Sequence, residues 1–580
     1  MKLRIPGWRR VDFGLLKEIL REFRFLLEGQ RGSMFSAFGL TILVAILELL
    51  RPWPLKFALD KAVILSQATA GELHVSQFLP SALGLIAIAA TLAVVQYGRA
   101  VTVAGIGRRA ATRLRRHLFQ HLHRLSFPFH LAQRTGDLLV RLMGDVNMVR
   151  DLVFASWIGL LSQIITIVLV LTILVVWSPW LALASLSPLP LLFWFGARSS
   201  KKLNAVTRKQ RKKEGEAASF AAESLAQIRL VKSYAWEDSM ARFFGQRARS
   251  SERAGAKAAG LAAKMAGIGE VLTGCGLAAV LLLGASEVSR GNMTAGTLVV
   301  IVSYVRLLYK PLRGMTKEGS RVARATACAE RILDILRQTP ENGQEGASAS
   351  QAVGDISFDS VSYSWDAGGR GVKDVTMRIP LHSITLIQGP NGSGKSTTLA
   401  LLLRLLKPDR NGGRILMNGV DIETFSLDSY RRRFAYVPQQ IHLLKGTIRE
   451  NLAYGLEGVT DADLHEASGA AGFDDVLARF RTGLDTPLGE RGETLSGGEA
   501  RRLMLARAAV RDAPYLLLDE PLEGLDTRAR AEVAASIQKL AEGRTVIAIS
   551  HGAPEELRPT HIVRLKEGVV VREDEGGSIP

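Results

Sequence analysis

Cysteine is scarce in this chain, which has only two among its 580 residues. Cys275 lies in an apolar run and Cys328 in a segment with helical periodicity, and their spacing fits neither a metal site nor a disulfide framework. A scaffold stabilised by disulfides is therefore excluded. We expect both cysteines to be packing residues without a chemical role.

The sequence also lacks the aromatic and basic surface that is typical of nucleic-acid binding. Its net charge of +19, from 74 Lys and Arg against 55 Asp and Glu, would by itself be compatible with a nucleic-acid partner. Much of this excess lies between long apolar runs, where it is typical of cytoplasmic loops. These basic residues are Arg108, Arg109, Arg113, Arg115, Arg116, Lys201, Lys202, Arg208, Lys209, Arg211, Lys212 and Lys213. We therefore expect no nucleic-acid partner.

Charged residues are sparse in six apolar runs in the first part of the chain. Each run is close to the length of about 20 residues that an α-helix needs to cross a bilayer. The runs lie near residues 35–60, 81–104, 153–177, 180–198, 265–286 and 295–316. They predict a multi-pass membrane domain that is surrounded by lipid.

The connections between these runs alternate between a lack and an excess of positive charge. The short connections, which together contain Arg290 as their one basic residue, are 65–80, 178–179 and 287–294. The connections 105–150 and 199–260 are long, basic and helical in pattern. Because basic loops stay on the cytoplasmic side, we expect both termini in the cytoplasm. The composition favours a bacterial inner (cell) membrane.

Three regions are predicted from these patterns. Residues 1–336 form the membrane domain, 337–353 a polar linker and 354–580 a soluble α/β domain. Within the first region, residues 11–28 alternate apolar and charged side chains. This alternation excludes a signal peptide and predicts an amphipathic helix on the membrane surface.

Aromatic residues mark the tips of the two long basic loops. One group begins at Phe127 with the sequence Phe-Pro-Phe-His, and the other spans Tyr234–Asp238. Such residues can dock onto a partner surface or take part in ordinary loop packing. The residues by themselves leave both interpretations open.

A glycine-rich loop in the soluble domain has the context of a phosphate-binding site. It follows the β-branched run Ile384–Ile387 and precedes a Leu-rich helical run over Leu399–Leu406. Glycines let several backbone N–H groups turn toward one anion, and the helix N-terminus adds its positive dipole end. Lys395 is expected to contact the β- and γ-phosphates and Ser396 to bind Mg²⁺. The loop residues are Gly389, Asn391, Gly392, Ser393, Gly394, Lys395, Ser396 and Thr397.

Two later apolar runs end in side chains suited to phosphoryl transfer. The first, Tyr515–Leu518, is followed by Asp519 and Glu520, and the second ends before His551. In an α/β sheet these groups would lie at the carboxyl edge of neighbouring strands. Asp519 would assist Mg²⁺, Glu520 would polarise the attacking water and His551 would contact the γ-phosphate.

A second possible anion-binding surface lies between these motifs. Ser and two Gly precede a helical run that is rich in Arg and Ala. One nucleotide does not obviously need two such surfaces from one chain, but two facing chains can each close the other's loop. The residues are Ser496, Gly497, Gly498 and Glu499.

Together these motifs resemble those of the nucleotide-binding domain of an ABC transporter, over the full length of the soluble domain. The resemblance implies the cofactors ATP and Mg²⁺. It also implies a glutamine loop at Gln439, which binds Mg²⁺ and couples to the membrane domain, and a D-loop at Asp526. Trp365 falls where this family stacks an aromatic ring on adenine, with Tyr363 as the alternative.

The membrane part resembles that of a half-exporter, with coupling helices expected at Phe127–Gln133 and Tyr234–Asp238. The segment 489–492 resembles the loop that exporters add to relay movement. Four positions depart from the usual motifs: Glu499 replaces Gln, Glu523-Gly524 replaces Ser-Ala, and Gly552 replaces Arg. The Glu-Gly-Leu-Asp variant of the D-loop also resembles that of heterodimeric thiol exporters.

The predicted protein is thus a multi-domain membrane protein, with a six-helix transmembrane domain followed by an α/β P-loop ATPase. Its predicted function is ATP-driven export of a lipid, peptide or drug-like substrate by alternating access in a dimer. The presence of Glu520 and His551 allows a homodimer with two competent sites, and the departures leave a heterodimer open. The alternatives are an ATP-gated regulator of a membrane partner or one half of a heterodimeric thiol or peptide exporter.

Overall fold

The computed structural model describes residues 18–19, 21–68, 75–151, 157–341, 346–349, 352–365, 370–489, 495–552 and 555–575. The chain divides into two compact units. The first comprises Met1–His123 and Arg134–Thr339, and the second comprises Arg124–Gln133 and Pro340–Pro580. A short piece of the first basic loop therefore belongs to the C-terminal unit.

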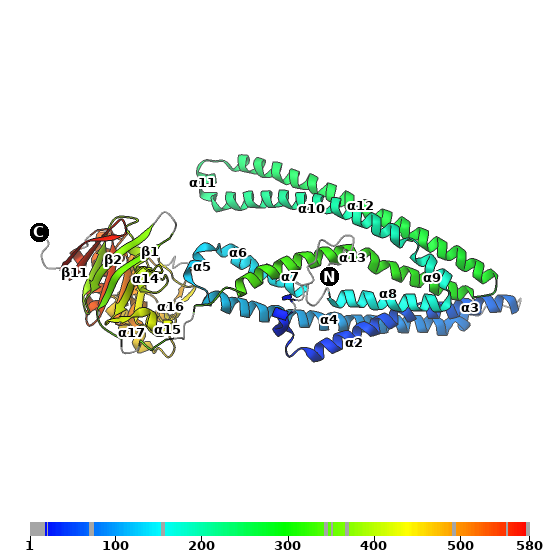
Figure 1. Ribbon diagram of the computed structural model, residues 1–580, viewed down its shortest axis with the longest axis horizontal. Coiled ribbons are helices and arrows are strands. Elements are labelled where there is room, and N and C mark those ends of the chain that lie inside the picture. Colours follow the sequence, from blue (N-terminus) through cyan, green and yellow to red (C-terminus); the bar gives the residue numbers. More distant parts are fainter. Residues whose placement is uncertain are drawn as a thin grey trace. The chain divides into compact units, whose positions relative to one another are not determined.

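The first unit is helical, which confirms the predicted helical membrane region (Figure 1). Its longer helices are α2 (Arg31–Leu50), α3 (Trp53–Ala68), α4 (Leu79–Arg124), α8 (Trp157–Trp177), α9 (Pro179–Leu186), α10 (Leu189–Ala226), α12 (Glu237–Ser289) and α13 (Ala295–Leu336). Shorter helices are Phe23–Leu27, Val75–Phe78, α6 (Thr135–Val140), the π-helix Arg141–Asp145, α7 (Val146–Arg150) and α11 (Ile228–Ser233). Figure 1 shows α10 and α12 running side by side as a long hairpin.

Apolar helical segments occur at all six predicted runs. Three of the described helices are long and apolar enough to cross a membrane: Arg31–Leu65, Val75–Arg124 and Glu237–Ser289. Shorter apolar segments lie at Leu161–Trp177, Pro179–Leu192 and Ala295–Tyr309. That all six segments span the bilayer stays a prediction. The helices α4 and α12, with 46 and 53 residues, exceed the length of about 20 residues that a bilayer requires.

Proline explains the break between α2 and α3. Pro52 has no backbone N–H, and its ring crowds the preceding helical turn, so α2 ends at Leu50 and α3 begins at Trp53. Tyr304 of α13 joins both pieces, because its hydroxyl donates to the Leu49 carbonyl at 2.8 Å and lies 3.0 Å from the Trp53 Nε1 donor. Pairing of these polar groups is required in an apolar interior.

An ion pair fastens the first basic loop to α13. Arg331 donates to both carboxylate oxygens of Asp145, at 2.8 and 2.7 Å, and its Nη2 also lies 3.2 Å from the Cys328 sulfur. Burial opposes ionisation of Asp145, but the Arg331 hydrogen bonds outweigh it and hold the pKa of this carboxyl below its ordinary value. Burial raises the pKa of Cys328 to about 11. Cys328 is therefore a neutral thiol, as expected of a residue without a chemical role.

The predicted interfacial helix over residues 11–28 is described only at residues 18–19 and 21–28. Its apolar side chains Ile19, Phe23 and Leu26 are almost completely buried against the protein. The backbone carbonyl of Glu28 accepts a hydrogen bond from Arg113 of α4. Part of the apolar face is therefore used for packing. Its placement on the membrane surface stays a prediction, and residues 1–17 and 20 lie outside the described residues.

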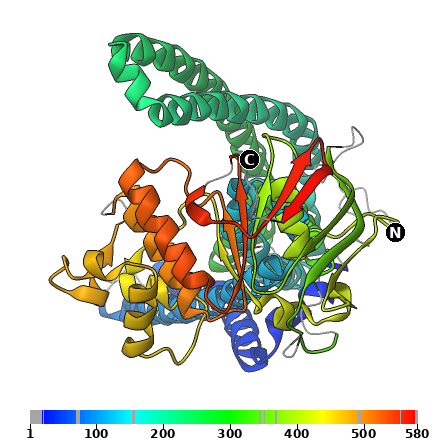
Figure 2. The same ribbon diagram turned by 90° about the vertical axis from the view of Figure 1, so that its left-hand side faces the viewer.

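The second unit combines strands and helices, as predicted. Its strands are β1 (Ile356–Ser364), β2 (Gly371–Ile379), β3 (Ile384–Gln388), β4 (Arg414–Met417), β5 (Val420–Asp421), β6 (Phe434–Val437), β7 (Gly446–Thr447), β8 (Pro487–Leu488), β9 (Tyr515–Asp519), β10 (Thr545–Ser550), β11 (His561–Lys566) and β12 (Val569–Glu575). Its helices are α5 (Phe127–Ala132), α14 (Lys395–Leu402), α15 (Leu427–Arg431), α16 (Ile448–Leu452), α17 (Asp461–Ala470), α18 (Asp474–Leu477), α19 (Gly497–Val510) and α20 (Thr527–Ala541), with short 3-10 helices at Ile422–Thr424, Gly483–Asp485 and Glu555–Leu557. Figure 2 shows the helices coloured yellow to orange on one side of the strands.

A six-stranded sheet in the order β12-β11-β3-β10-β9-β6 organises this unit. All neighbouring strands are parallel except β12, which runs antiparallel to β11. Alternate residues face different cores, so that Leu516 and Leu518 pack on the helical side while Tyr515 and Leu517 pack on the other. A separate antiparallel sheet, in the order β2-β1-β4-β5, packs on this other side of the six-stranded sheet. The buried apolar side chains on this side form what we call the second core.

The register of the parallel strands aligns their carboxyl ends. Asp519 of β9 pairs with Ile549 of β10, and Ser550 of β10 pairs with Gln388 of β3. Val437 of β6 pairs with Leu518 of β9. The segments that follow these four strands therefore leave the sheet along one edge, where α/β proteins bind their ligands.

Helix α5 shows what the first aromatic loop tip does. Phe127 packs against the second core of the C-terminal unit, and Glu341 donates its backbone N–H to the Arg124 carbonyl at 2.7 Å. Phe127 therefore packs within the C-terminal unit, and its docking onto a partner surface stays a prediction. The domain boundaries at 336 and 353 stay predictions, and residues 342–345 and 350–351 of the linker lie outside the described residues.

Candidate active site

The glycine-rich loop connects β3 to α14 as predicted, and its shape requires glycine. Gly394 has φ +101°, in the left-handed region, and a Cβ atom there would lie 2.7 Å from Val372. A Cβ at Gly389 would lie 2.2 Å from the backbone oxygen of Leu565. The buried Ser393 hydroxyl has no hydrogen-bond partner among the described residues. The loop thus provides a narrow cradle with a spare polar group, which fits a phosphate chain.

Lys395 occupies the centre of this loop. Its side chain is buried, and its ammonium group donates to the carbonyls of Gly389 at 2.7 Å and Pro390 at 3.0 Å. Burial lowers the pKa of Lys395, while the nearby carboxylates of Glu520 and Asp519 oppose this shift. A buried cation whose short hydrogen bonds are to neutral carbonyls is well placed to bind phosphate oxygens.

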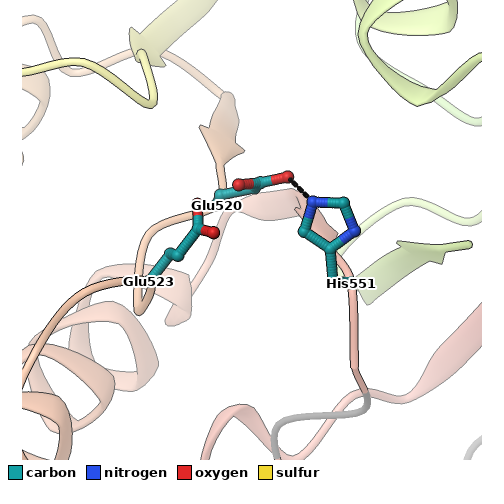
Figure 3. Close-up of side chains that lie close together, drawn as sticks. All are labelled: Glu520, Glu523 and His551. Carbon is teal, nitrogen blue, oxygen red and sulfur yellow. Dashed lines mark ion pairs between the residues drawn. The ribbon is translucent and has the colours of Figure 1, made fainter. Parts of the chain in front are cut away.

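Glu520 follows β9 with an unusual backbone conformation. Its φ of +50° is in the left-handed region, and its N–H donates to the Ile549 carbonyl at 3.0 Å. Such a conformation costs about 1–3 kcal/mol in a residue other than glycine and is common at functional sites. It directs the buried carboxylate toward His551, whose Nε2 lies 2.7 Å from Glu520 Oε1 (Figure 3). The other His551 ring nitrogen lies 3.5 Å from Lys395 Nζ.

Gln439 joins this group from the loop after β6. Its amide nitrogen donates to Glu520 Oε2 at 2.6 Å and to Glu523 Oε2 at 3.0 Å. Burial and the nearby Glu523 raise the pKa of Glu520, whereas hydrogen bonds from Glu520 and Gln439 lower that of Glu523. The two carboxyl groups therefore titrate as a pair.

A magnesium site is supported by the chemistry of the donors. The Asp519 carboxylate, the Gln439 amide and the Ser396 hydroxyl are oxygen donors of the kind that Mg²⁺ prefers. Asp519 is partly buried, which raises its pKa, and it accepts a hydrogen bond from Tyr436 that opposes this shift. Ser396 is exposed at the start of α14. These residues fit the ion, and their assignment as ligands is a proposal.

The second anion-binding surface forms the start of α19. Ser496 and Glu499 form a capping box, in which Glu499 N–H donates to Ser496 Oγ at 3.3 Å and Ser496 N–H donates to Glu499 Oε2 at 2.9 Å. Because Glu and Gln both suit this position, the Glu499 departure preserves the helix start. Gly498 contacts α20, since a Cβ there would lie 2.9 Å from the Ala529 Cβ. Asp526 caps α20 by accepting from the Ala529 N–H at 2.8 Å.

The structure brings one group of predicted residues together and leaves the other apart. Lys395, Glu520, His551 and Gln439 are linked by the contacts above, with Asp519 next to Glu520. Among the described residues, Ser496 and Gly497 are exposed and make no hydrogen bond to residues 389–397. The relay segment is described only at Gly489, and residues 490–492 lie outside the described residues.

Arg501, a site residue that sequence reasoning missed, supports the glutamine loop. This buried side chain of α19 donates to the carbonyls of Pro438 and Gln439, both at 2.9 Å. Burial lowers the pKa of Arg501, and the carboxylates of Asp519, Glu523 and Glu520 oppose this shift. The one available signal was an Arg-rich run directly after the Ser-Gly-Gly motif.

Trp365 lies next to the glycine-rich loop. Its indole N–H donates to the Thr397 hydroxyl at 3.0 Å, and its side chain is 44% exposed. Tyr363 packs on the second core and contacts Trp365 edge to face, with ring centroids 5.2 Å apart. Trp365 is therefore partly exposed beside the loop and supported by Tyr363, and stacking of adenine on its ring stays a prediction.

We expect Trp365→Ala to weaken ATP binding about tenfold, because stacking of a base on an aromatic ring contributes about 1–3 kcal/mol. Equilibrium binding of a fluorescent ATP analogue to the purified chain measures this effect. Tyr363→Phe is the matched control, since it keeps the supporting ring, and its affinity should equal that of the wild type. Unchanged affinity in the Trp365 variant would contradict its assignment as the stacking residue.

Known families match both parts of the chain. Residues 34–312 match the ABC transporter transmembrane region, and residues 372–523 match the ABC transporter family. An ATP-dependent lipid A-core flippase of Nitrosococcus oceani is 30% identical over 480 residues, which are 82% of this chain and 79% of that protein. A flippase with the same name from Desulfotalea psychrophila is 29% identical over 96% of both chains.

A solved structure agrees with these matches. The structure of a bacterial Atm1-family ABC exporter with ATP bound superimposes with a TM-score of 0.77. Its sequence is 26% identical, and the match covers 94% of this chain and 96% of that one. The similarity extends over the helical unit and the unit that contains the candidate site.

Proposed function

The chain belongs to the ABC transporter family, as an ATP-hydrolysing exporter of the half-transporter type, and from this premise we propose that it moves a hydrophobic or amphipathic substrate across the bacterial inner membrane. The observation that carries the proposal is the joining of Lys395, Glu520, His551 and Gln439 at one sheet edge. A lipid-like substrate is supported by the two relatives that are named lipid A-core flippases.

Each residue of the site has a role that follows from its contacts. Bound Mg–ATP supplies the phosphoryl group and neutralises its charge. Lys395 would bind phosphate oxygens in the glycine-rich loop, and Ser396, Asp519 and Gln439 would hold the metal. Glu520 orients and polarises the attacking water, while His551 holds the Glu520 carboxylate in position through their 2.7 Å contact.

Helix α5 provides the link from hydrolysis to the membrane. It follows the 46-residue α4 in the chain, and Phe127 packs on the core of the ATPase unit. Because α4 ends only three residues before the packed Phe127, displacement of the ATPase unit would be transmitted to the membrane segments through α4. Phe127 is therefore proposed as a coupling residue.

A second half-transporter is proposed as the partner. Tyr234 and Trp236, at the predicted second coupling helix, are 75% and 52% exposed and lie beside an apolar cavity of about 650 Å³ between α10, α11 and the start of α12. The start of α19 is also exposed. Both surfaces suit a second copy of this chain, whose glycine-rich loop the exposed Ser496 would close.

ATP hydrolysis by this chain alone in lipid nanodiscs tests the proposal. We expect turnover that amphipathic lipids or drug-like compounds stimulate severalfold. Phe127→Ala should keep basal hydrolysis and lose the stimulation, because the ATP site remains intact while its link to the membrane helices is weakened. Phe480→Ala, in the same unit but outside the second core, is the matched control. Turnover that no amphiphile changes would contradict export of such substrates, and no turnover would contradict a self-sufficient homodimer.

A further inference from the structure

The D-loop carries a second carboxylate at the candidate site. Glu523 is exposed, three residues after Glu520, at a position where Ser is more common in this family. Its carboxylate, that of Glu520 and the His551 ring offer three ligand atoms within 4.8 Å of one another (Figure 3). The catalytic role proposed for Glu520 uses one carboxylate, which leaves Glu523 without a role.

The contacts of Gln439 indicate what Glu523 does. Both N–H bonds of its amide are occupied, one by Glu520 at 2.6 Å and the other by Glu523 at 3.0 Å. Carboxylates only accept here, so the NH₂ group and not the carbonyl oxygen must face them. The amide oxygen, which is the atom that can bind a metal ion, therefore has its direction set by the two carboxylates.

The backbone of Gln439 cannot relieve this restraint easily. Arg501 donates to the carbonyls of residues 438 and 439, both at 2.9 Å, and Arg501 is itself buried. Rotation of the Gln439 side chain is thus the movement that remains for turning the amide. That rotation requires the hydrogen bonds to Glu520 and Glu523 to break.

We propose that Glu523 is a positioning residue that restrains the Gln439 amide and thereby sets how readily the ATP site takes up its divalent cation. The proposal rests on the nucleotide-site assignments of the preceding section. Glu523, in the D-loop, favours the orientation of the Gln439 amide in which the NH₂ group faces the carboxylates. The cation favours the orientation in which the amide oxygen faces the metal site. The restraint is released when Glu523 moves away from Gln439, so movement of the D-loop regulates metal binding.

Two substitutions at position 523 separate this restraint from simple electrostatics. Glu523→Gln and Glu523→Ser both remove one negative charge. The resulting loss of electrostatic attraction for the cation is therefore the same in both variants and cancels when their affinities are compared. Glu523→Gln keeps an acceptor oxygen at the same reach, whereas the Ser hydroxyl is two bonds too short to contact Gln439. Because Glu523 lines an existing cavity of about 260 Å³, neither change buries a new void.

The probe is Mn²⁺, measured by electron paramagnetic resonance with a non-hydrolysable ATP analogue bound to the full-length chain in nanodiscs. We expect Glu523→Ser to bind Mn²⁺ about threefold more tightly than Glu523→Gln, the effect of losing one hydrogen bond to a neutral acceptor. In a Gln439→Ala background the two variants should have equal affinities. The matched pair Glu542→Ser and Glu542→Gln, at the exposed end of α20, should both equal the wild type.

Hydrolysis gives a second readout. The Mg²⁺ concentration for half-maximal rate should differ between the two Glu523 variants, while their rates at saturating Mg²⁺ agree. Equal Mn²⁺ affinities of these variants, or a difference that persists without Gln439, would overturn the proposed restraint alone. A wild-type chain that binds no nucleotide-dependent Mn²⁺ would overturn the site assignments and, with them, the restraint.

Discussion

Replacement of Lys395 by Ala is expected to weaken ATP binding by about two orders of magnitude, since loss of one member of a buried, hydrogen-bonded charge pair costs about 2–5 kcal/mol. The ammonium group is buried and donates to two carbonyls of its own loop, so its direction is set before phosphate arrives. Because the ammonium group is already oriented, little conformational entropy is lost when it binds phosphate, and this one contact contributes strongly to ATP affinity. Binding of radiolabelled ATP in nanodiscs measures the loss.

Lys407→Ala is the matched control for this result. Lys407 lies in the same unit, is 75% exposed and pairs with Glu423, so removal of its charge should leave ATP affinity unchanged. Equal losses in the two variants would indicate a general charge effect. Thermal unfolding of both proteins tests whether the Lys395 variant remains folded.

Replacement of Glu520 by Gln is expected to reduce ATP hydrolysis about 10²- to 10⁴-fold, the usual contribution of a positioned general base. Gln keeps the size of the side chain and still offers an oxygen to the Gln439 amide, while it cannot take up a proton. ATP binding should therefore remain within about twofold of the wild type. The combination of retained binding and lost turnover distinguishes a catalytic defect from misfolding.

The hydrolysis rate and ATP affinity of purified wild-type and variant chains, measured side by side, check this expectation. Glu466→Gln removes an equivalent carboxylate from the exposed face of α17 and should leave both quantities unchanged. Substantial turnover in the Glu520 variant would assign the base to another group. Glu523, which shares the Gln439 amide with Glu520, is the first to test.

Continuous patterns account for the predictions that the fold confirms. The apolar runs specified the helical membrane region because the length and hydropathy of a segment are local properties. The glycine-rich loop between β3 and α14 could also be predicted from local sequence, because its residues are contiguous. At several of these positions the backbone conformation or a close contact requires glycine. The strand ends at Asp519 and Ser550 were predicted from the buried runs that precede them.

Packing of distant elements accounts for the rest. The family resemblance predicted a coupling helix at Phe127. The residues there do not show that α5 belongs to a unit whose other residues begin more than 200 positions later, because that membership depends on an apolar core assembled elsewhere. Likewise, the burial of Arg501 and its two carbonyl contacts depend on how α19 meets the loop after β6. The Arg-rich run after the Ser-Gly-Gly motif does not reveal which of its members makes these contacts.

The sequence by itself determined that this protein has a helical membrane region and a nucleotide-binding ATPase domain, because both are encoded in contiguous motifs. Only the tertiary structure decided that Glu523 shares the Gln439 amide with Glu520 and that His551 lies between Glu520 and Lys395. These residues are as much as 156 positions apart, and the parallel register of β3, β10, β9 and β6 sets their separation in space. Strand register depends on side-chain packing across the whole sheet. For that reason only the tertiary fold decides which of these side chains contact one another.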